Sequence, residues 1–288
     1  MTFSIVAVDP GTGDVGVAVA SKFLAVGNIV PWVEAGRGAV ATQALCNATF
    51  GPDGLALLAE LPAPTVLEEL LSNDQGQERR QVGIVDVHGG AAIHTGSGCQ
   101  PWAGHRTGAG YAWQGNCLTG PEVINEMVTT FEGSDGLLVD RLFAALRAGD
   151  RAGGDRRGRQ SAAIKVFRKG AGYQGLGDTV MDLRVDDDPQ RMVELARLIG
   201  IHKLFFPTPG DSERLQIEGA VLAELRTFAR ENGHSVGDAR GWAPDLRAAI
   251  DAYIGTENLE ERVDLDARTI DAIALDYLRA KQSRSAKS

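Results

Sequence analysis

The chain has 288 residues, of which 43% are hydrophobic and 23% charged, a balance that is usual for a folded globular protein. Its formal net charge of -9 argues against a nucleic-acid-binding protein, because surfaces that bind nucleic acid are basic. The three cysteines include no Cys-x-x-Cys pair, which argues against a disulfide framework and against a zinc site. We therefore expect no metal or other cofactor.

The sequence also argues against export and membrane insertion. The first 20 residues lack a basic start, and Asp9 and Asp14 interrupt their apolar run, which is unlike a signal peptide. No uninterrupted run of about 20 apolar residues is present, so we expect no membrane partner. Together with the sparse cysteines, these features predict a cytoplasmic protein.

The chain begins with predicted sheet. Residues 3–8 and 15–20 are short apolar runs rich in valine, and a Pro-Gly-Thr-Gly turn separates them. This pattern predicts a β-hairpin whose two strands are buried on both faces. Two further strands are expected at 28–33 and 38–43, joined by a turn at Gly36 and Gly38.

Helices and strands then come in pairs. The apolar spacing predicts, in chain order, helices near 55–61 and 64–71, strands at 81–90 and 91–96, a loop rich in Gly and Trp over 96–120, helices near 123–131 and 138–146, and strands at 161–168 and 179–185. Paired strands that do not alternate singly with helices disfavour a parallel doubly wound sheet. The order instead predicts an α+β fold, a four-layer αββα sandwich in which helices cover the outer faces of two packed sheets.

A second region is expected after a linker at 207–211, which is rich in proline and glycine. Apolar residues beyond it follow helical spacing in three stretches, which begin near Ile217, Leu246 and Ile270. We therefore divide the chain into a domain at 1–206, a small helical module at 207–282 and a disordered tail at 283–288.

Long motifs of the first domain resemble those of the DUF1028 family. They are TFSIVAVDPGTGDVGVAVASKFLAVG, VPWVEAGRGAVATQ, TGSGCQPWAGHRTGAGYAWQGNCLTG, AGGDRRGRQSAAIKV and DLRVDDDP. The resemblance covers about residues 2–206. It implies the αββα sandwich of the N-terminal-nucleophile (Ntn) hydrolase superfamily. The C-terminal stretch IGTENLEERV resembles a peptidoglycan-binding-like domain, which implies a cell-wall fragment as a partner.

Thr2 is the candidate nucleophile that this resemblance implies. Once Met1 is removed, Thr2 carries a hydroxyl and a free α-amine, which is a nucleophile with its own base. Its α-amine has a reference pKa of about 7.7–8.0 and suits general-base work near neutral pH. The alternative is that Thr2 is only a residue with high β propensity at the start of a strand.

The resemblance also implies residues around the nucleophile. Ser21 and Lys22 end the second strand, where related enzymes place an acidic or polar residue, and Lys22 would stabilise an anionic intermediate. The alternative is an exposed Ser-Lys turn. Asp155 and Ser161 precede and begin a later strand, where such folds place an acid and a hydroxyl that support the α-amine.

The stretch WQGNCLTG is the expected oxyanion element, with Gln114 and Asn116 as amide donors beside a glycine. The alternative is a glycine turn before a helix, with Thr119 and Glu122 as its capping box.

The candidate substrate-binding residues are Thr42, His105, Arg157 and Gln160. Arg157 and Gln160 would meet a substrate carboxylate, and His105 would line the site from the glycine-rich loop. A solvated charge run is the alternative for the arginines.

No metal or nucleotide motif is present. His88 and His94 lack a carboxylate at ligand spacing, and the run of three acids at 186–188 is more typical of a solvated helix start. The glycines match neither a dinucleotide fingerprint nor a P-loop. We therefore expect an amide hydrolase, a homodimer, that acts on a small metabolite, peptide or acylated amino acid. The alternative is a binding or scaffold protein of the same fold that engages cell-wall fragments.

Overall fold

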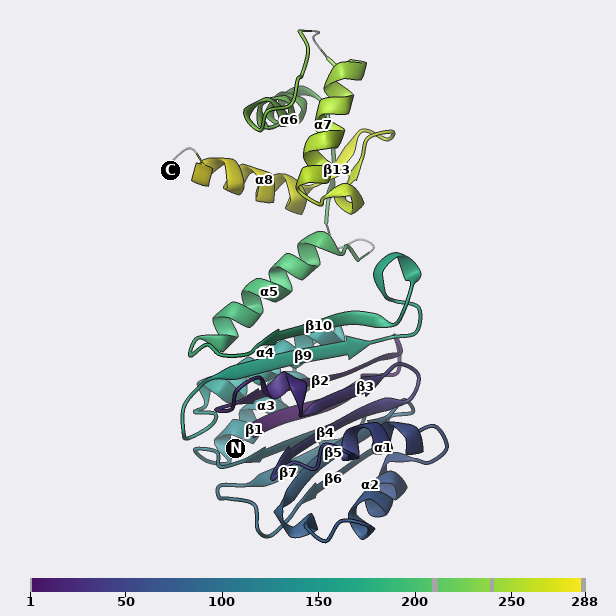
Figure 1. Cartoon of the computed structure of the whole chain (residues 1–288), viewed down its shortest axis with the longest axis vertical. Coiled ribbons are helices and arrows are strands. Elements are labelled where there is room, and N and C mark those ends of the chain that lie inside the picture. The colour runs from purple at the N-terminus through teal and green to yellow at the C-terminus, as the bar shows by residue number, and fades with distance from the viewer. Residues whose placement is uncertain (1, 209–211, 239–240, 286–288) are drawn as a thin grey trace. The chain divides into compact units, whose positions relative to one another are not determined.

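The computed structural model describes residues 2–208, 212–238 and 241–285 (Figure 1). The chain divides into two compact units, Met1–Leu198 and Ile199–Ser288, with the division inside helix α5 (Arg191–Phe205). The described residues form a mixed α+β structure with three antiparallel sheets and eight α-helices. The predicted α+β class is confirmed.

Two of the sheets belong to the first unit. The larger has the strand order β10-β9-β2-β1-β8-β7 and the smaller the order β3-β4-β5-β6. The larger sheet comprises β1 (Thr2–Asp9), β2 (Asp14–Ser21), β7 (Gly104–Gly108), β8 (Tyr111–Asn116), β9 (Ser161–Phe167) and β10 (Thr179–Val185). The smaller comprises β3 (Pro31–Glu34), β4 (Gly38–Ala44), β5 (Arg80–Asp86) and β6 (Ala91–Thr95).

The predicted N-terminal hairpin forms because its turn satisfies its own backbone groups. The Asp9 carboxylate accepts a hydrogen bond from the N–H of Gly11, and Gly13 takes a φ of 79° that glycine adopts without steric cost. The turn aligns β1 and β2 so that Thr2 pairs with Ser21. The central strands of the larger sheet are thus fixed in register from the chain's first residues onward.

The strands alternate between two apolar cores. Val6, Val17 and Val19 belong to one buried cluster with Ala41 and Val85, which come from the smaller sheet, so the two sheets pack face to face. The opposite face of the hairpin packs on helix α4 (Leu138–Arg151): the Phe3 ring lies beside Gly149, and Gly16 lies beside Leu142.

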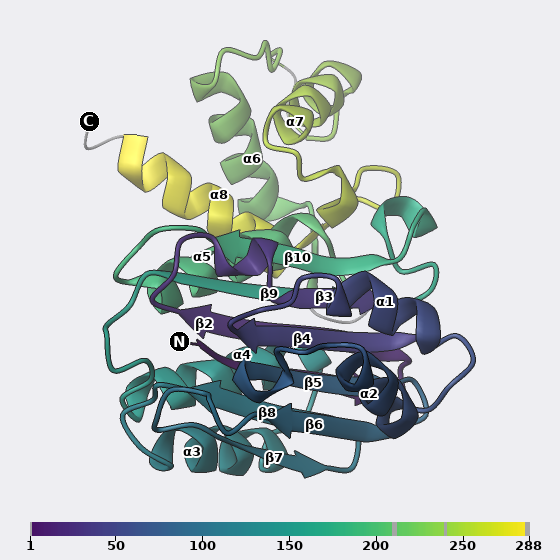
Figure 2. The same cartoon turned by 60° about the horizontal axis from the view of Figure 1, so that its bottom comes forward.

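The smaller sheet is covered in turn on its outer face. Val40, Val82 and Ile84 form a buried cluster with leucines of helices α1 (Phe50–Leu57) and α2 (Ala63–Ser72). Figure 2 shows α1 and α2 over the smaller sheet, with α3 (Glu122–Glu132) and α4 beyond the larger one. The site described below lies between the sheets, at the end where β1 starts.

Several predicted boundaries are wrong in detail. The loop predicted at 96–120 contains β7 and β8, because the glycine-rich composition hid an edge strand and its neighbour. Residues 26–28 form a short 3₁₀ helix before β3, and the predicted Thr119–Glu122 capping box is absent, since α3 has no side-chain cap. The strands predicted at 161–168 and 179–185 are confirmed.

The second unit holds helices α6 (Gly219–Glu231), α7 (Pro244–Thr256) and α8 (Ala272–Ser285). It also contains a small sheet of order β11-β13-β12, made of β11 (Arg214–Gln216), β12 (Val263–Asp264) and β13 (Thr269–Asp271). This sheet was not predicted from the sequence.

Two predictions for this region are wrong in detail. Ile270 was expected in a helix but lies in β13. Residues 283–285 of the predicted disordered tail belong to α8, whereas 286–288 and the linker residues 209–211 lie outside the described residues. Among the helices that are described, none is long and apolar enough to cross a bilayer.

Candidate functional site

Four predicted site residues meet in one row across the larger sheet. Strand register pairs Asn116 with Thr2, Thr2 with Ser21, and Ser21 with Ser161, so the row crosses β8, β1, β2 and β9. All four residues are buried, and Thr2 is the most exposed of them at 5%. Four buried polar residues lie side by side at the end of an otherwise apolar sheet. Because each buried polar group needs a hydrogen-bond partner, such a row indicates a candidate functional site.

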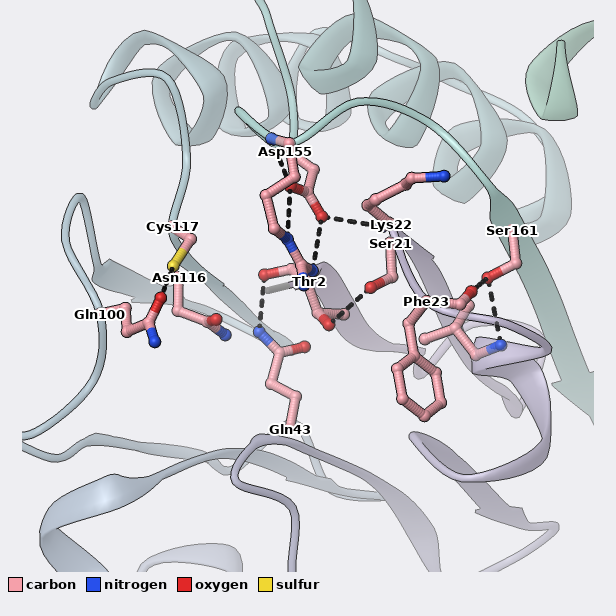
Figure 3. Close-up of polar contacts among 12 residues, drawn as sticks. Thr2, Ser21, Lys22, Phe23, Gln43, Gln100, Asn116, Cys117, Asp155 and Ser161 are labelled. Atoms are coloured by element: carbon pink, nitrogen blue, oxygen red, sulfur yellow. Dashed lines mark hydrogen bonds and ion pairs between the residues drawn. The ribbon is translucent and has the colours of Figure 1, made fainter. Parts of the chain in front are cut away.

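Thr2 stands at the centre of this row (Figure 3). Its Oγ1 is 3.1 Å from Ser21 Oγ, and its carbonyl oxygen accepts a hydrogen bond of 3.1 Å from Gln43 Nε2. These contacts come from both sheets, β2 in the larger and β4 in the smaller. They fix the first residue of β1 on two sides.

A network of buried amides holds the two sheets together beside Thr2. Gln43 Nε2 donates 2.7 Å to Gln81 Oε1, and Asn116 Nδ2 donates 3.0 Å to the same oxygen. Gln81 Nε2 in turn donates to the carbonyl of Gly115. Neither Gln43 nor Gln81 was predicted as a site residue, although a glutamine within or beside a run of buried β-branched residues is a signal that could have identified them.

Asp155 ties two loops to the row. Its buried carboxylate accepts hydrogen bonds from the backbone N–H of Lys22 at 2.7 Å and from the Arg157 guanidinium at 3.1 Å. Figure 3 shows this carboxylate pointing toward the Thr2 end of β1, while the exposed Lys22 ammonium points away from Thr2. Lys22 therefore contributes its backbone N–H to the site, and its ammonium does not point toward Thr2 as the predicted role would require.

Ser161 braces the loop that follows β2. Its hydroxyl donates to the carbonyl of Phe23 and accepts from the N–H of Val26 at 3.1 Å. Ala25, between them, has a φ of 50°. Phe23 is thereby held at the edge of the site with its side chain 50% exposed.

Two cavities adjoin at this end of the sheets. The first, of about 540 Å³, is lined by Thr2, Phe23, Val26, Ile29, Val30, Gln43, Ala44, Leu45, Cys46, Ala48 and Arg80. The second, of about 320 Å³, is lined by Phe23, Ala44, Leu45, Arg79, Gly98, Cys99, Gln100, Asn116, Cys117 and Arg157. Thr2 lines the first cavity and Asn116 lines the second. These two paired residues therefore lie where the cavities adjoin.

Residues 2–195 match the family model described as a family of unknown function, DUF1028. The chain belongs to the DUF1028 family. A solved structure of the same family, protein SPO2555 from Silicibacter pomeroyi, is 33% identical in sequence with a TM-score of 0.64; the match covers 70% of this chain and 86% of that one. Among curated proteins, none is significantly similar to this chain.

Of the four substrate-binding residues predicted for this DUF1028 protein, Arg157 lines the second cavity and the other three line neither. Thr42 lines neither, because its hydroxyl donates to the carbonyl of Asn47, whereas the next residue, Gln43, lines the first. His105 is exposed, and its Nδ1 lies 2.9 Å from Thr95 Oγ1. Gln160 also lines neither cavity, and its carbonyl accepts a hydrogen bond from the N–H of Asp188.

Gln114 and Asn116 have different surroundings, although both belong to β8. Gln114 Nε2 donates to the carbonyl of Ala41 at 2.7 Å and to Ser4 Oγ at 3.2 Å, so both of its N–H groups point between the sheets. Asn116 lines the second cavity. Of the two predicted amide donors, Asn116 is therefore the one that faces open space.

The three cysteines lie around these cavities but are poor nucleophiles. Burial raises the pKa of the Cys46, Cys99 and Cys117 thiols, so they stay protonated near neutral pH. In the part of the chain that the structure describes, no three His, Cys, Asp or Glu side chains gather as a metal-binding cluster. The hydroxyls of the row are consequently the groups to consider for covalent chemistry.

Proposed function

We propose that this DUF1028 protein hydrolyses amide bonds with Thr2 as an N-terminal nucleophile. Its two facing sheets between pairs of helices are proposed to be the αββα sandwich of the Ntn hydrolases. The observation that carries the proposal is the position of Thr2: the first residue of a central strand, with its hydroxyl bonded to Ser21 beside an open cavity.

The proposed reaction begins when cleavage before Thr2 frees its α-amine. The amine takes the hydroxyl proton as Thr2 Oγ1 bonds to the substrate carbonyl carbon. The same proton then passes to the amide nitrogen, the C–N bond breaks, and the amine product leaves. Water attacks the resulting ester, gives a proton to the α-amine, and releases the carboxylic acid as Oγ1 regains its proton. The sum is one amide plus one water giving one acid and one amine.

Asn116 is the proposed oxyanion donor. It pairs in register with Thr2, and its amide nitrogen has a second N–H besides the one that bonds Gln81. Gln114 is unsuited to this role because its amide N–H groups are bonded to Ala41 and Ser4. A preorganised donor of this kind contributes about 3 kcal/mol to transition-state stabilisation in other enzymes.

Ser21 and Asp155 are proposed to support the nucleophile. Ser21 Oγ holds the Thr2 hydroxyl at 3.1 Å, which fixes its side-chain rotamer. Asp155 is a buried carboxylate that points toward the start of β1 (Figure 3), and its negative charge would favour the α-ammonium formed during attack.

The second candidate function is ligand binding by the second unit without catalysis. A cavity of about 350 Å³ is lined there by Trp242, Ala243, Pro244, Arg247, Ala248 and Asp251. The Arg268 guanidinium lies over the Trp242 ring, 5.5 Å from its centre. An aromatic ring beside charged groups suits a polar cell-wall fragment, and Trp242→Ala would abolish retention on peptidoglycan if this function holds.

Intact mass and turnover together test the first proposal. Active protein should begin at Thr2, Thr2→Ser should retain measurable turnover of an amide panel, and Thr2→Ala should lose it. The circular dichroism spectrum of Thr2→Ala should match that of the native chain. Amide hydrolysis by protein that keeps Met1 would contradict the mechanism. The expected homodimer stays a prediction, which sedimentation velocity tests.

A further inference from the structure

Resting on the proposed function, we infer that the substrate is an N-acyl amino acid whose acyl group is apolar and whose amine part carries a carboxylate. The inference comes from the unequal chemistry of the two cavities that meet beside Thr2 and Asn116. One accepts hydrocarbon, and the other accepts negative charge.

The first cavity suits the acyl group. Thr2 lines it and does not line the second, so a group esterified to Thr2 Oγ1 would extend into it. Most of its remaining walls are hydrocarbon, contributed by Phe23, Val26, Ile29, Val30, Ala44, Leu45 and Ala48. A volume of about 540 Å³ accommodates a medium-length alkyl chain with its carbonyl at Thr2.

Among the described residues that line the first cavity, Arg80 is the arginine, and it does not make this cavity an anion site. Arg80 Nε is 2.6 Å from Asp74 Oδ2, its NH2 group donates to the same carboxylate, and its NH1 group donates to the carbonyl of Leu45. The Asp74 charge neutralises the guanidinium, and the three bonds occupy all three of its nitrogens. This arginine braces the cavity wall, and the cavity keeps its preference for apolar groups.

The second cavity has the opposite character. Its lining includes Arg79, Arg157, Gln100 and Asn116, and none of the described residues that line it is acidic. Arg157 is paired with Asp155, but Arg79 is exposed and forms no salt bridge with any residue that the structure describes. Arg79 is thus a guanidinium available to a carboxylate, for which its planar donors are well suited.

The residues that line both cavities indicate how the acyl and amine parts of the substrate would lie. Phe23, Ala44 and Leu45 line both cavities, so one molecule that crosses this wall would fill both. Phe23 and Leu45 are 50% and 54% exposed, and a bound acyl chain would cover them. The scissile amide then lies between Thr2 on one side and Asn116 on the other.

Binding to the Thr2→Ala variant tests the inference separately from catalysis. N-octanoylglutamate, N-acetylglutamate and N-octanoylbutylamine are titrated into the variant by calorimetry. N-octanoylglutamate should bind more tightly than N-acetylglutamate, by about fourfold for each added CH₂ until the first cavity is full. It should also bind more tightly than the neutral amide N-octanoylbutylamine. Equal affinities for all three compounds would overturn the inference.

Two substitutions locate the contacts. Arg79→Gln should weaken N-octanoylglutamate about tenfold and leave N-octanoylbutylamine unchanged, whereas the exposed control Arg151→Gln should change neither. Ala48→Leu, at an exposed cavity residue, should shift the preference to shorter chains. Unchanged selectivity in both cavity variants would overturn the inference.

Thiol protection in the unmutated chain, measured over a time short enough that the ligand stays saturating, provides an independent readout should Thr2→Ala fold poorly. N-octanoylglutamate should slow alkylation of Cys46, which lines the first cavity, and of Cys99, which lines the second. N-octanoylbutylamine should protect Cys46 more than Cys99, and the reverse pattern would count against the assignment. If the ligands bind as expected but the native chain cleaves none of them, the proposed hydrolysis fails and the binding inference stands.

Discussion

The hydroxyls of Thr2 and Ser21 lie 3.1 Å apart on neighbouring strands, although 19 residues separate them along the chain. The turn between β1 and β2 creates this contact, because its length sets the register that pairs the first residue of β1 with the last of β2. Both residues are buried. The local chemistry of a surface turn thereby determines the surroundings of the candidate nucleophile.

Replacing Ser21 with alanine tests the role of this contact. Ser21→Ala should lower the free energy of unfolding by about 1 kcal/mol, the typical net value of one buried hydrogen bond. It should also lower kcat for any amide substrate more than it changes KM, because the Thr2 rotamer is no longer fixed. Urea unfolding and steady-state kinetics measure the two effects, and an unchanged kcat would contradict the positioning role.

Replacing Asp155 with asparagine tests the tie between the loops. The carboxylate accepts from the Lys22 backbone and the Arg157 guanidinium, and its side chain is fully buried. Asp155→Asn should therefore cost about 2 kcal/mol of stability, because charge-assisted hydrogen bonds are lost in a buried place. Thermal unfolding checks this value. Asp187→Asn, at an exposed acid after β10, is the control and should leave stability unchanged.

Replacing Gln81 with leucine tests the amide network. Gln81 Oε1 accepts from Gln43 and Asn116, so its loss leaves two buried amides without that partner. We expect a loss of about 3 kcal/mol in Gln81→Leu and lower kcat, since Asn116 is no longer oriented. The matched change Gln75→Leu, at an exposed residue, should have little effect on either quantity. Equal stabilities of the two variants would show that the network is dispensable.

Tyr111 predicts how stability depends on alkaline pH. Burial and the hydrogen bond to Glu132 raise its pKa to about 12, from about 10 in an unfolded chain. A raised pKa means that the contribution is complete below pH 10 and is lost as the pH rises through 12. Relative to Tyr111→Phe, the native chain should therefore lose about 1 kcal/mol between pH 9 and pH 11.

Urea unfolding at several pH values measures this difference, and comparison of the two chains removes the contribution of other titrating groups. Tyr173→Phe, at a residue 59% exposed, should retain the native pH dependence. A native chain and a Tyr111→Phe variant with parallel pH profiles would contradict the prediction.

The sequence predicted the row of hydroxyl and amide residues but not their partners in the other sheet. Thr2, Ser21, Asn116 and Ser161 stand in recognisable motifs, and antiparallel register brings them together. Gln43 and Gln81 act across the space between the sheets, and no local pattern shows which strands face each other. Side chains alternate along β4, so Thr42 and Gln43 point to opposite faces.

Fold prediction failed where glycine and polar residues replaced the usual strand pattern. Residues 104–108 read GHRTG and form an edge strand whose central side chains are exposed, so no apolar alternation marks it. The strand β8 reads YAWQGN, and its Gln114 and Asn116 are buried with their amides bonded to residues of the smaller sheet. The strand was missed because buried amides stand where apolar residues usually mark a strand.

The proposed mechanism requires Thr2 to be the first residue of the active chain and to carry the acyl group. Peptide mass spectrometry, after brief incubation with the activated ester p-nitrophenyl octanoate and acid quenching, measures both properties at once. We expect an N-terminal peptide that begins at Thr2 and bears one octanoyl group on its side-chain oxygen. Acylation at any other residue, or an active chain whose N-terminal peptide still begins with Met1, would contradict it.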